Sequence, residues 1–407
     1  MKHNFLFALE VIGCRIYQAV FKIGLYAVPY RMPEYIDGPG SICRLPEFLR
    51  SKKADDLLVV TDRTLMKLGL LDKMLEALDE AGIHYTCFSD VGSNPTTEEV
   101  ENGFRCYQEH GCRSVLAVGG GSPMDCAKAI CARVAHPNRT LAQMEGVFRV
   151  LKRVPPLFAV PTTAGTGSET TITAVITDSA TNRKATMNDF CLIPKYAILD
   201  PELTVGLPPY ITAITGMDAL SHAVESYTNH RYATKVENDL ARKAVKLIYD
   251  NILAAYTDGT DLQARQNMQY AALYAGRAFT RGCVGHVHAI GHTLGSMYHI
   301  PHGLAMSVLL PHVMREFGPA VHQRLAELAD VCGIEGASDA QKSDRFIAWM
   351  EETNQKMGIP DSFDVIKDED IDQIITWSRK ETNPLYPVPV IWSREDFFRF
   401  IQKIRSK

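Results

Sequence analysis

The sequence has no large excess of charge of either sign. Its 407 residues include 43 lysines and arginines against 47 aspartates and glutamates, a formal net charge of −4. Nucleic-acid-binding proteins usually carry a strongly basic surface, so this balance argues against a nucleic-acid partner. Apolar residues make up 46% of the chain and charged residues 22%. These values are typical of a folded globular protein and exclude a largely disordered one.

Cysteine motifs are also missing. The chain has 10 cysteines, but no two of them are spaced as Cys-x-x-Cys. Zinc-finger and dithiol redox motifs are therefore not indicated. The cysteines are scattered through apolar or helical sequence, which favours a reducing compartment over a disulfide framework. We therefore predict a cytoplasmic protein.

Long uncharged stretches are absent from the N-terminal region. Within residues 3–30, Glu10, Arg15 and Lys22 interrupt the apolar sequence, and the longest uncharged run covers residues 23–30. A helix that spans a bilayer needs about 18 apolar residues. We therefore expect no transmembrane span, and the missing cleavage pattern argues against a signal peptide.

Apolar residues nevertheless recur at helical spacing in this region, which predicts an amphipathic helix. The stripe consists of Phe5, Leu9, Ile12, Ile16, Val20 and Ile23. Two interpretations stay open. The stripe packs on the protein's own fold or a partner subunit, or it attaches the protein to a membrane surface.

Strands and helices alternate from about residue 38 to residue 200. Apolar runs at 56–62, 84–89, 114–118 and 157–160 predict strands, and the sequence between them predicts helices over 65–81, from Thr96 and from Pro123. Such alternation predicts an α/β fold in which helices cover both faces of a parallel sheet.

The pattern changes after Asp200, where Pro201, Gly206, Pro208 and Pro209 punctuate the chain. Long helical patterns dominate beyond this point. We therefore predict an N-terminal extension over residues 1–30, an α/β domain over 31–206 and an all-helical domain over 207–407.

A glycine-rich turn joins the third predicted strand to the next helix. Gly119, Gly120 and Gly121 allow backbone N–H groups to approach a phosphate, and the helix N-terminus attracts its charge. Ser122 is expected to cap this helix, with Asp125 completing a box-like cap. The usual dinucleotide fingerprint ends in glycine, whereas Met124 stands there. A glycine turn without a ligand is therefore the alternative.

Two further segments favour a nucleotide cofactor. The loop after the strand at 157–160 contains Thr162, Thr163 and Thr166 among glycines, and these hydroxyls are possible donors to a phosphate. Asp62 ends the first strong strand, where a carboxylate binds an adenosine ribose and repels a 2′-phosphate. This favours NAD over NADP. The alternative for Asp62 is a simple helix cap.

Histidines are concentrated in one segment, since six of the 13 lie between residues 286 and 312. Upstream, Asp218 and His222 are four residues apart, so on a helix they share one face. One carboxylate and three imidazoles would suit Fe²⁺ or Zn²⁺ and leave a position open for substrate. By spacing alone His288 and His292 form a second ligand pair. The sequence does not decide which of the clustered histidines bind.

The motifs together resemble those of the iron-containing (group III) alcohol dehydrogenases. They are GGGSPMDCAKAI at 119–130, PTTAGTGSET at 161–170, GMDALSHAVESY at 216–227 and GHVHAIGHTLGSMYHIPHG at 285–303. The resemblance runs from about Pro33 to the C-terminus. It implies a dehydroquinate synthase-like fold with an N-terminal dinucleotide-binding domain, an all-helical C-terminal domain and an active site in the cleft between them. Residues 1–28 have no counterpart in this pattern.

The resemblance also implies roles for single residues. Its metal ligands correspond to Asp218, His222, His288 and His302, and it places His292 beside the metal, where this side chain helps to move protons. Its cofactor-binding positions correspond to Asp62, Asn94, Gly120, Gly121, Ser122, Thr162, Thr163 and Lys184. We add Asp125 and Thr166 from the same two loops. His286, His299 and His312 match no ligand position.

The implied activity is reversible hydride transfer between NAD(H) and a primary alcohol or its aldehyde, in a protein expected to form a homodimer or higher homo-oligomer. The metal would be Fe²⁺, with Zn²⁺ as the alternative. The nearest alternatives share the fold: a glycerol- or propanediol-type polyol dehydrogenase, a hydroxyacid–oxoacid transhydrogenase, or a dehydroquinate synthase-like enzyme. A non-catalytic metal-binding protein is the alternative from another class.

Overall fold

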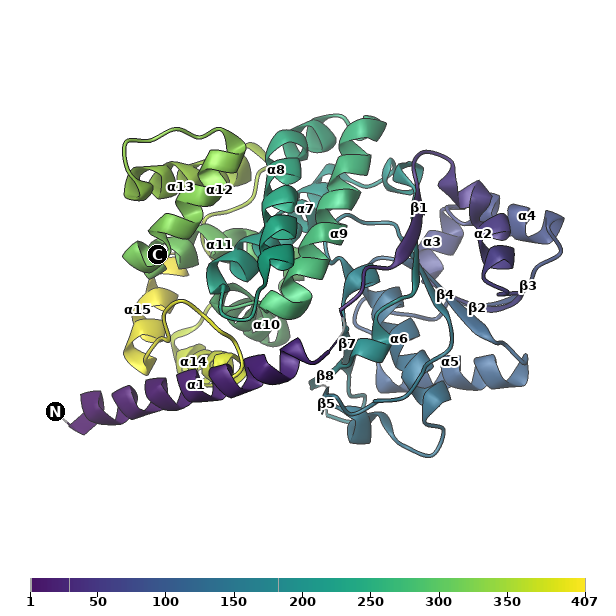
Figure 1. Cartoon of the computed structure of the whole chain (residues 1–407), viewed down its shortest axis with the longest axis horizontal. Helices are drawn as coiled ribbons and strands as arrows, with labels where there is room; N and C mark the ends of the chain where they lie inside the picture. The colour runs from purple at the N-terminus through teal and green to yellow at the C-terminus, as the bar shows by residue number, and fades with distance from the viewer. Residues whose placement is uncertain (1, 29, 182, 407) are drawn as a thin grey trace. The chain divides into compact units, whose positions relative to one another are not determined.

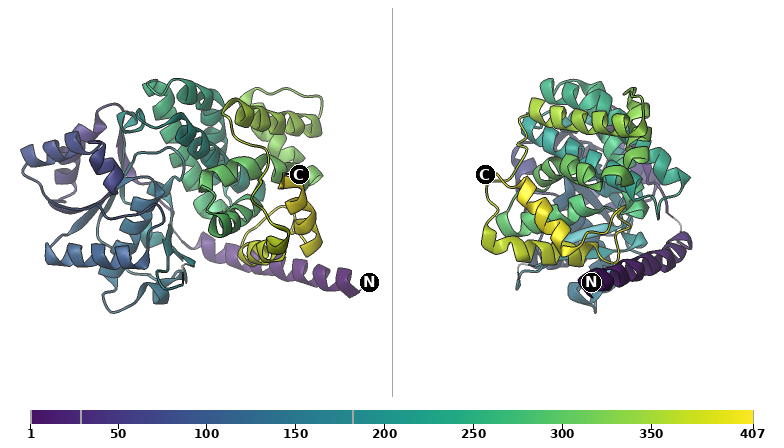
Figure 2. Two further views of the ribbon diagram at one scale, coloured as in Figure 1. Left: turned by 180° about the vertical axis from the view of Figure 1, so that it is seen from behind. Right: turned by 90° about the vertical axis from the view of Figure 1, so that its left-hand side faces the viewer.

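The computed structural model describes residues 2–28, 30–181 and 183–406 and divides the chain into two compact units. Unit 1 contains residues 1–29, 208–258 and 270–407, and unit 2 contains residues 30–207 and 259–269. Figure 1 and Figure 2 show the two units, one built of helices and the other around a sheet. The α/β fold with an all-helical C-terminal part is thereby confirmed.

Unit 2 is built on a six-stranded parallel sheet in the order β1-β9-β6-β4-β2-β3. Its strands are β1 (Glu34–Asp37), β2 (Asp56–Val60), β3 (His84–Phe88), β4 (Ser114–Gly119), β6 (Leu157–Pro161) and β9 (Tyr196–Leu199). A second sheet has the order β5-β8-β7, with β5 (Gly146–Val147), β7 (Thr173–Thr177) and β8 (Lys184–Asn188).

Helices cover both faces of the six-stranded sheet, as the apolar strands predict. They are α2 (Leu45–Ser51), α3 (Arg63–Lys67), α4 (Asp72–Glu80), α5 (Thr97–Glu109) and α6 (Gly121–Ala135). Successive strand residues alternate between two cores, because side chains of a strand point to opposite faces. Leu58 and Val60 pack in the core that includes α5 and α6, whereas Leu57 and Val59 pack in the core that includes α2 and α4.

The single helix predicted over 65–81 is wrong. The structure has two short helices there, α3 and α4, and the chain between them turns at Gly69, whose φ of +66° lies in the left-handed region. Glycine adopts this conformation without the steric penalty of a Cβ atom, so it ends the first helix. The helix predicted from Thr96 is present as α5, and Thr96 caps it in a capping box with Glu99.

Unit 1 is built of helices. They are α1 (Lys2–Tyr26), α7 (Pro209–Asn229), α8 (Lys235–Thr257), α10 (His286–Tyr298), α11 (His302–Phe317), α12 (His322–Cys332), α13 (Asp339–Lys356), α14 (Ile371–Thr382) and α15 (Arg394–Ile404). Helix α9 (Leu262–Gly282) begins in unit 2 and ends in unit 1. Helix α7 is buried along most of its length, and it is this helix that positions the candidate site.

The N-terminal helix is present as α1, but it packs by a different face than its apolar stripe suggests. Cys14, Gln18 and Leu25 are buried, whereas the predicted stripe from Phe5 to Ile23 is exposed. The expectation that this stripe packs on the protein's own fold is therefore wrong. No helix in the described part of the chain combines the length and apolar character needed to cross a bilayer.

Candidate functional site

Three helices of unit 1 bring four possible metal ligands together. Asp218 and His222 lie one turn apart on α7, His288 lies in the first turn of α10, and His302 is the first residue of α11. Their ligand atoms all lie within 4.8 Å of one another. The set is the one that the family resemblance implies. Two of the three imidazoles come from helix starts, where the chain turns after Gly285 and Pro301.

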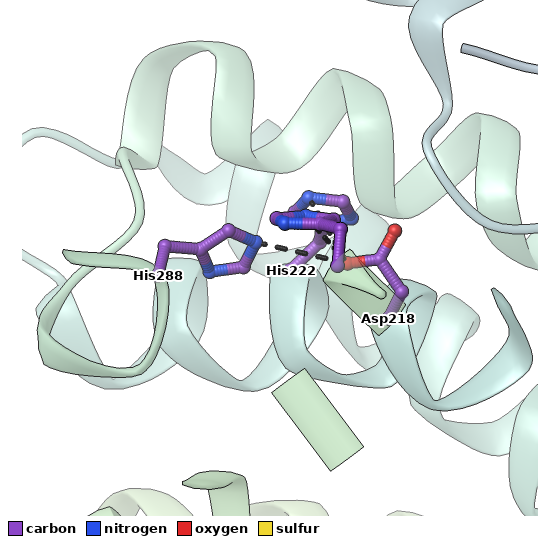
Figure 3. Close-up of side chains that lie close together, drawn as sticks. Asp218, His222 and His288 are labelled. Carbon is purple, nitrogen blue, oxygen red and sulfur yellow. Dashed lines mark ion pairs between the residues drawn. The ribbon is translucent and has the colours of Figure 1, made fainter. Parts of the chain in front are cut away.

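Asp218 is the centre of this cluster. Its Oδ1 lies 3.8 Å from the Nε2 atom of His222, 3.8 Å from that of His288 and 3.3 Å from that of His302. Figure 3 shows the Asp218 carboxylate directed toward the imidazoles of His222 and His288. Three ring nitrogens thus converge on one carboxylate oxygen.

The buried polar atoms of the cluster fit a bound cation. Asp218 Oδ1 and His288 Nε2 are buried and have no hydrogen-bond partner in the structure. Such orphaned atoms are costly unless an ion satisfies them. Burial lowers the pKa of His222 to about 3 and that of His288 well below its ordinary value, so both rings are held neutral, as metal ligation requires.

The charge of Asp218 is stabilised within the cluster. Burial alone would raise its pKa, but the positive charge that the facing imidazoles of His222, His302 and His288 carry when protonated outweighs burial and holds the pKa below its ordinary value. The donor set is thus one carboxylate and three imidazoles, which matches the preference of Fe²⁺ and Zn²⁺.

Glu225 holds one histidine of the cluster in place, a role that the sequence did not predict. Its Oε2 lies 2.5 Å from His288 Nδ1, and its Oε1 accepts a hydrogen bond of 2.8 Å from the backbone N–H of Val287. A histidine whose Nδ1–H is held by a carboxylate presents its bare Nε2 atom to a metal. Burial raises the pKa of Glu225 to about 7. Its spacing, seven residues after Asp218 on one helix, is the signal that could have found it.

His292 lies beside the cluster rather than in it. The structure does not place it among the four converging residues, so the ligand pair suggested by the spacing of His288 and His292 is wrong. Its ring lies 5.2 Å from that of His302, centroid to centroid, and its Nδ1 lies 2.7 Å from Glu381 Oε1. Tyr386 donates a hydrogen bond of 3.1 Å to the same carboxylate oxygen.

Two of the remaining three histidines of the segment, His286 and His312, have structural contacts. His286 is buried, stacks on Trp392 and lies 3.0 Å from the carbonyl oxygen of Val390 through its Nε2. His312 Nε2 lies 2.8 Å from the carbonyl oxygen of Asp361. His299 is the residue after α10 and has a φ of +57°.

In unit 2, the two predicted cofactor loops lie side by side. β4 and β6 are adjacent parallel strands, and Gly119 pairs with Pro161 where they end. A Cβ added to Gly120 would lie 3.4 Å from Thr163 Oγ1, and one added to Gly121 would lie 3.0 Å from Thr166 Cγ2. These glycines therefore allow a close approach of the two loops, in addition to any approach of a phosphate.

The predicted cap of the helix after the glycine turn is wrong. Helix α6 begins at Gly121, and its N-cap, Gly120, makes no side-chain capping hydrogen bond. Ser122 lies inside the helix and donates to the carbonyl oxygen of Ser93 at 2.6 Å, which ties the glycine turn to the loop that carries Asn94. A helix that begins without a side-chain cap keeps its first N–H groups for another acceptor.

Asp125 joins the two loops rather than capping the helix. Its carboxylate accepts hydrogen bonds of 3.1 Å from the Ser168 hydroxyl and from the Val175 backbone N–H. Lys128, which sequence reasoning missed, is buried and donates to Ser168 Oγ at 2.9 Å and to Thr171 Oγ1 at 2.8 Å. Burial lowers the pKa of Lys128 to about 8. This network fixes the hydroxyl-rich loop against α6.

Asp62 is the N-cap of α3, as its alternative interpretation predicts. Its Oδ1 accepts hydrogen bonds of 2.8 Å from the backbone N–H of Thr64 and 2.9 Å from that of Leu65. It follows β2, the neighbour of β4 in the sheet. Thr162 is buried beside the glycine turn, whereas Asn94 and Lys184 are exposed. A role of these residues in cofactor binding stays a prediction.

Comparisons with known proteins agree over most of the chain. A family model described as iron-containing alcohol dehydrogenase matches residues 33–201, and the model of the C-terminal part of that family matches residues 212–404. A 1,3-propanediol dehydrogenase of Klebsiella pneumoniae is 40% identical over 344 residues, which cover 81% of this chain and 88% of the relative.

Two further relatives are similar. An NAD-dependent methanol dehydrogenase of Bacillus methanolicus is 38% identical over 344 residues, covering 84% of this chain and 90% of the relative. Among solved structures, a 1,3-propanediol oxidoreductase superposes with a TM-score of 0.88 at 35% identity, covering 92% of this chain and 99% of the other.

Proposed function

The chain belongs to the iron-containing alcohol dehydrogenase family, and from this premise we propose that it interconverts a primary alcohol and its aldehyde with NAD(H) at a metal held by unit 1. The family membership confirms the resemblance of the motifs. The observation that carries the proposal is the convergence of Asp218, His222, His288 and His302, whose buried Asp218 Oδ1 and His288 Nε2 atoms have no hydrogen-bond partner.

We assign the four converging residues as the metal ligands. A divalent cation bound by these residues would supply Lewis-acid chemistry to the substrate oxygen. The carboxylate of Asp218 would offset part of the charge of such an ion, and Glu225 orients His288 through its Nδ1. The donor set accepts iron or zinc, and the family favours iron.

We assign His292 as the group that moves the hydroxyl proton. It lies beside the cluster, and its Nδ1 faces Glu381 at 2.7 Å. The carboxylate orients the ring so that Nε2 is the atom that exchanges a proton with substrate or water. An imidazole held in this way can accept the proton in one direction of the reaction and return it in the other.

We assign the cofactor to the carboxyl ends of the strands of unit 2. Gly120, Gly121, Ser122, Thr162, Thr163 and Thr166 would bind the pyrophosphate, with Asn94, Asp125 and Lys184 as further contacts. The free N-terminus of α6 supports a phosphate there. The carboxylate of Asp62 supports NAD over NADP, because it would repel a 2′-phosphate. Residues 31–206 are then the NAD-binding domain and 207–407 the metal-binding domain.

A polyol substrate is the second candidate, because two of the similar proteins act on 1,3-propanediol according to their names. A hydroxyacid–oxoacid transhydrogenase remains the same-fold alternative. We also propose a cytoplasmic homo-oligomer.

The test combines metal content with activity. His288→Ala should lose both the metal and the activity, whereas His292→Ala should keep the metal and lose about 10²- to 10⁴-fold in kcat. Full activity in metal-free His288→Ala protein would contradict the mechanism. Assays of primary alcohols, diols and aldehydes of increasing chain length with NAD and NADP, aerobically and anaerobically, identify the substrate class and the cofactor.

A further inference from the structure

Helix α1 presents an apolar face that nothing in the described structure covers. We call this the outer face, and it consists of Phe5, Leu9, Ile12, Ile16, Val20 and Ile23. Each of these side chains is between 49% and 73% exposed. Leu6, Tyr17 and Tyr26 flank them and are also exposed. A well-packed helix normally turns such residues inward.

The opposite face fixes α1 to unit 1, so the outer face is held away from the unit. Glu10 accepts hydrogen bonds of 2.7 Å from Arg379 on α14, and buried Gln18 donates to the carbonyl oxygens of Pro384 and Tyr386 at 3.1 Å and 2.9 Å. Arg15 donates to the carbonyl oxygen of Pro389. Figure 1 and Figure 2 show α1 lying along α14. Glu10 and Arg15 therefore bind unit 1 on the inner side of α1.

The outer face is also an addition to the catalytic fold. The family model begins at residue 33, beyond the end of α1. The match to the propanediol oxidoreductase structure includes 99% of that protein but only 92% of this chain, so part of this chain has no counterpart in it. The fold shared with the family therefore does not explain why this helix exposes apolar residues. A contact outside the described structure would explain them.

The exposed area suits a protein interface. The nine large side chains, most of them half to three quarters exposed, present on the order of 1,000 Å². Monomeric proteins rarely expose an apolar patch above about 600 Å², and a standard interface buries about 800 Å² on each partner. The outer face together with its three flanking side chains therefore provides the area that a stable pair of chains needs.

The distribution of charge favours another protein surface over a lipid surface. Helices that lie on membranes carry lysines and arginines on their polar side. Between residues 5 and 28, the only cations are Arg15 and Lys22, and both are half-buried. Arg15 bonds within unit 1, and Lys22 lies over the ring of Tyr26. The chain as a whole is acidic, with a net charge of −4, which an anionic membrane would repel.

We propose that the outer face of α1 pairs with the same face of a second copy of this chain, as two antiparallel helices about a two-fold axis. In this arrangement Phe5 faces Ile23 of the other copy, and Ile12 faces Ile16. No like charges meet among the described side chains of the outer face, because Phe5, Leu9, Ile12, Ile16, Val20 and Ile23 are all apolar. A Cβ added to Gly13, beside the axis, would meet no atom within 4 Å, so the second helix can approach closely.

The first test measures the molar mass of the full chain by light scattering and sedimentation. Ile12→Glu combined with Ile16→Glu should reduce the mass of the assembly twofold, because two buried carboxylates would oppose two others. Leu151→Glu combined with Val236→Glu is the matched control, since both side chains are exposed apolar residues outside α1. Equal mass for the wild type and the α1 variant would overturn the proposal.

The second test identifies what contacts the face. A photo-crosslinking phenylalanine analogue at position 5, in a mixture of isotopically light and heavy chains, should link light to heavy chains near Ile23. Cross-links confined to a single chain, or none, would contradict the pairing. The pairing would also be overturned if the wild type had the same molar mass as the variant with Ile12→Glu and Ile16→Glu. Sedimentation of that wild-type protein with anionic vesicles would then identify a lipid surface as the partner of the outer face. Because neither readout uses activity, a failure here is distinguishable from a failure of the proposed enzymatic function.

Discussion

At the residue scale, Glu225 holds a histidine of the proposed metal site without belonging to the four converging residues. Its two carboxylate oxygens serve two donors, the ring of His288 and the backbone N–H of Val287. The side chain is almost fully buried, so neither donor has water as a substitute. Loss of one acceptor would release the imidazole that completes the cluster.

We therefore expect Glu225→Gln to lower metal affinity about 10- to 100-fold, as is usual for the partner of a ligating histidine. A glutamine has one carbonyl oxygen and keeps the side-chain volume, so one of the two donors loses its acceptor. Competition with a chelator, read by metal analysis, measures the effect. Glu395→Gln, an exposed position in the same unit, is the control. Unchanged affinity in Glu225→Gln would show that His288 needs no support.

His286 gives a prediction for pH. Burial lowers its pKa to about 3 in the folded protein, against about 6.5 in the unfolded chain. Between these values the unfolded state binds the additional proton, so stability is present above pH 6.5 and is lost as the pH falls toward 3. We expect this residue to contribute a slope of up to about 1.4 kcal/mol per pH unit.

Urea unfolding of the wild type and His286→Phe at several pH values between 7 and 4 measures this slope. The variant is expected to be less stable at pH 7, because the hydrogen bond to Val390 is lost. Its stability should also fall less steeply with acidification. Parallel pH profiles for the two proteins would exclude the contribution.

At the element scale, the turn before α6 and the loop after β6 form one structure. Gly121 lies close to the side chain of Thr166. A methyl group added to Gly121 would place its carbon 3.0 Å from Thr166 Cγ2, which is too close for both to stay in place. Gly121→Ala should therefore separate the loops and weaken NADH binding by several-fold to tenfold. Thr166→Ser removes the nearest atom, so the double variant should recover most of the affinity.

Fluorescence titration measures the affinity for NADH of Gly121→Ala, of Thr166→Ser and of the double variant. Gly206→Ala, in the same unit, is the control, because its added methyl group meets no atom within 4 Å. If Gly121→Ala binds NADH as the wild type does, the two loops do not form the cofactor site.

Gln18 provides a test of how α1 is attached. Its side-chain amide is buried and makes two hydrogen bonds to carbonyl oxygens. Gln18→Ala leaves both acceptors unpaired, so we expect a loss of about 1–3 kcal/mol in the stability of the helix contact. Hydrogen exchange across α1 and residues 383–389 reports the loss. Ile16→Ala, on the outer face, should leave exchange of residues 383–389 unchanged in protein kept dilute.

At the scale of the whole molecule, each unit contains one set of candidate site residues. The four proposed metal ligands and Glu225 belong to unit 1, and the glycine and threonine loops belong to unit 2. A ligand stabilises the part of a protein that binds it, by about 2.7 kcal/mol at 100 times its dissociation constant. Chelation of the metal should therefore act mainly on one unit and NADH mainly on the other.

Hydrogen exchange with peptide resolution tests this separation. Chelation should lower the protection of α7, α10 and the start of α11, whereas NADH should raise the protection of the turn at 119–122 and the loop at 162–168. Equal changes in both units after chelation alone would show that the two sites are not energetically separate.

Much of the fold and of the site was predictable because it depends on local pattern. The apolar runs that form β2, β3, β4 and β6 identify the parallel sheet, and the spacing of Asp218 and His222 places both on one face of α7. The hydroxyl-rich loop and the glycine turn each follow a strand, which predicts that they meet at one edge of the sheet. The break at Gly69 was not predictable from apolar periodicity, because a single residue changed the chain direction.

Sequence by itself therefore determined the class of fold, the kinds of ligand and, through the family motifs, which four residues match the metal positions. Tertiary structure decided that His292 faces Glu381, that Glu225 holds His288, and that α1 packs by Cys14, Gln18 and Leu25. The physical reason is the same in each case. Periodicity shows which residues share a face of a helix, but only the packing of distant elements determines which face is covered and which side chains meet.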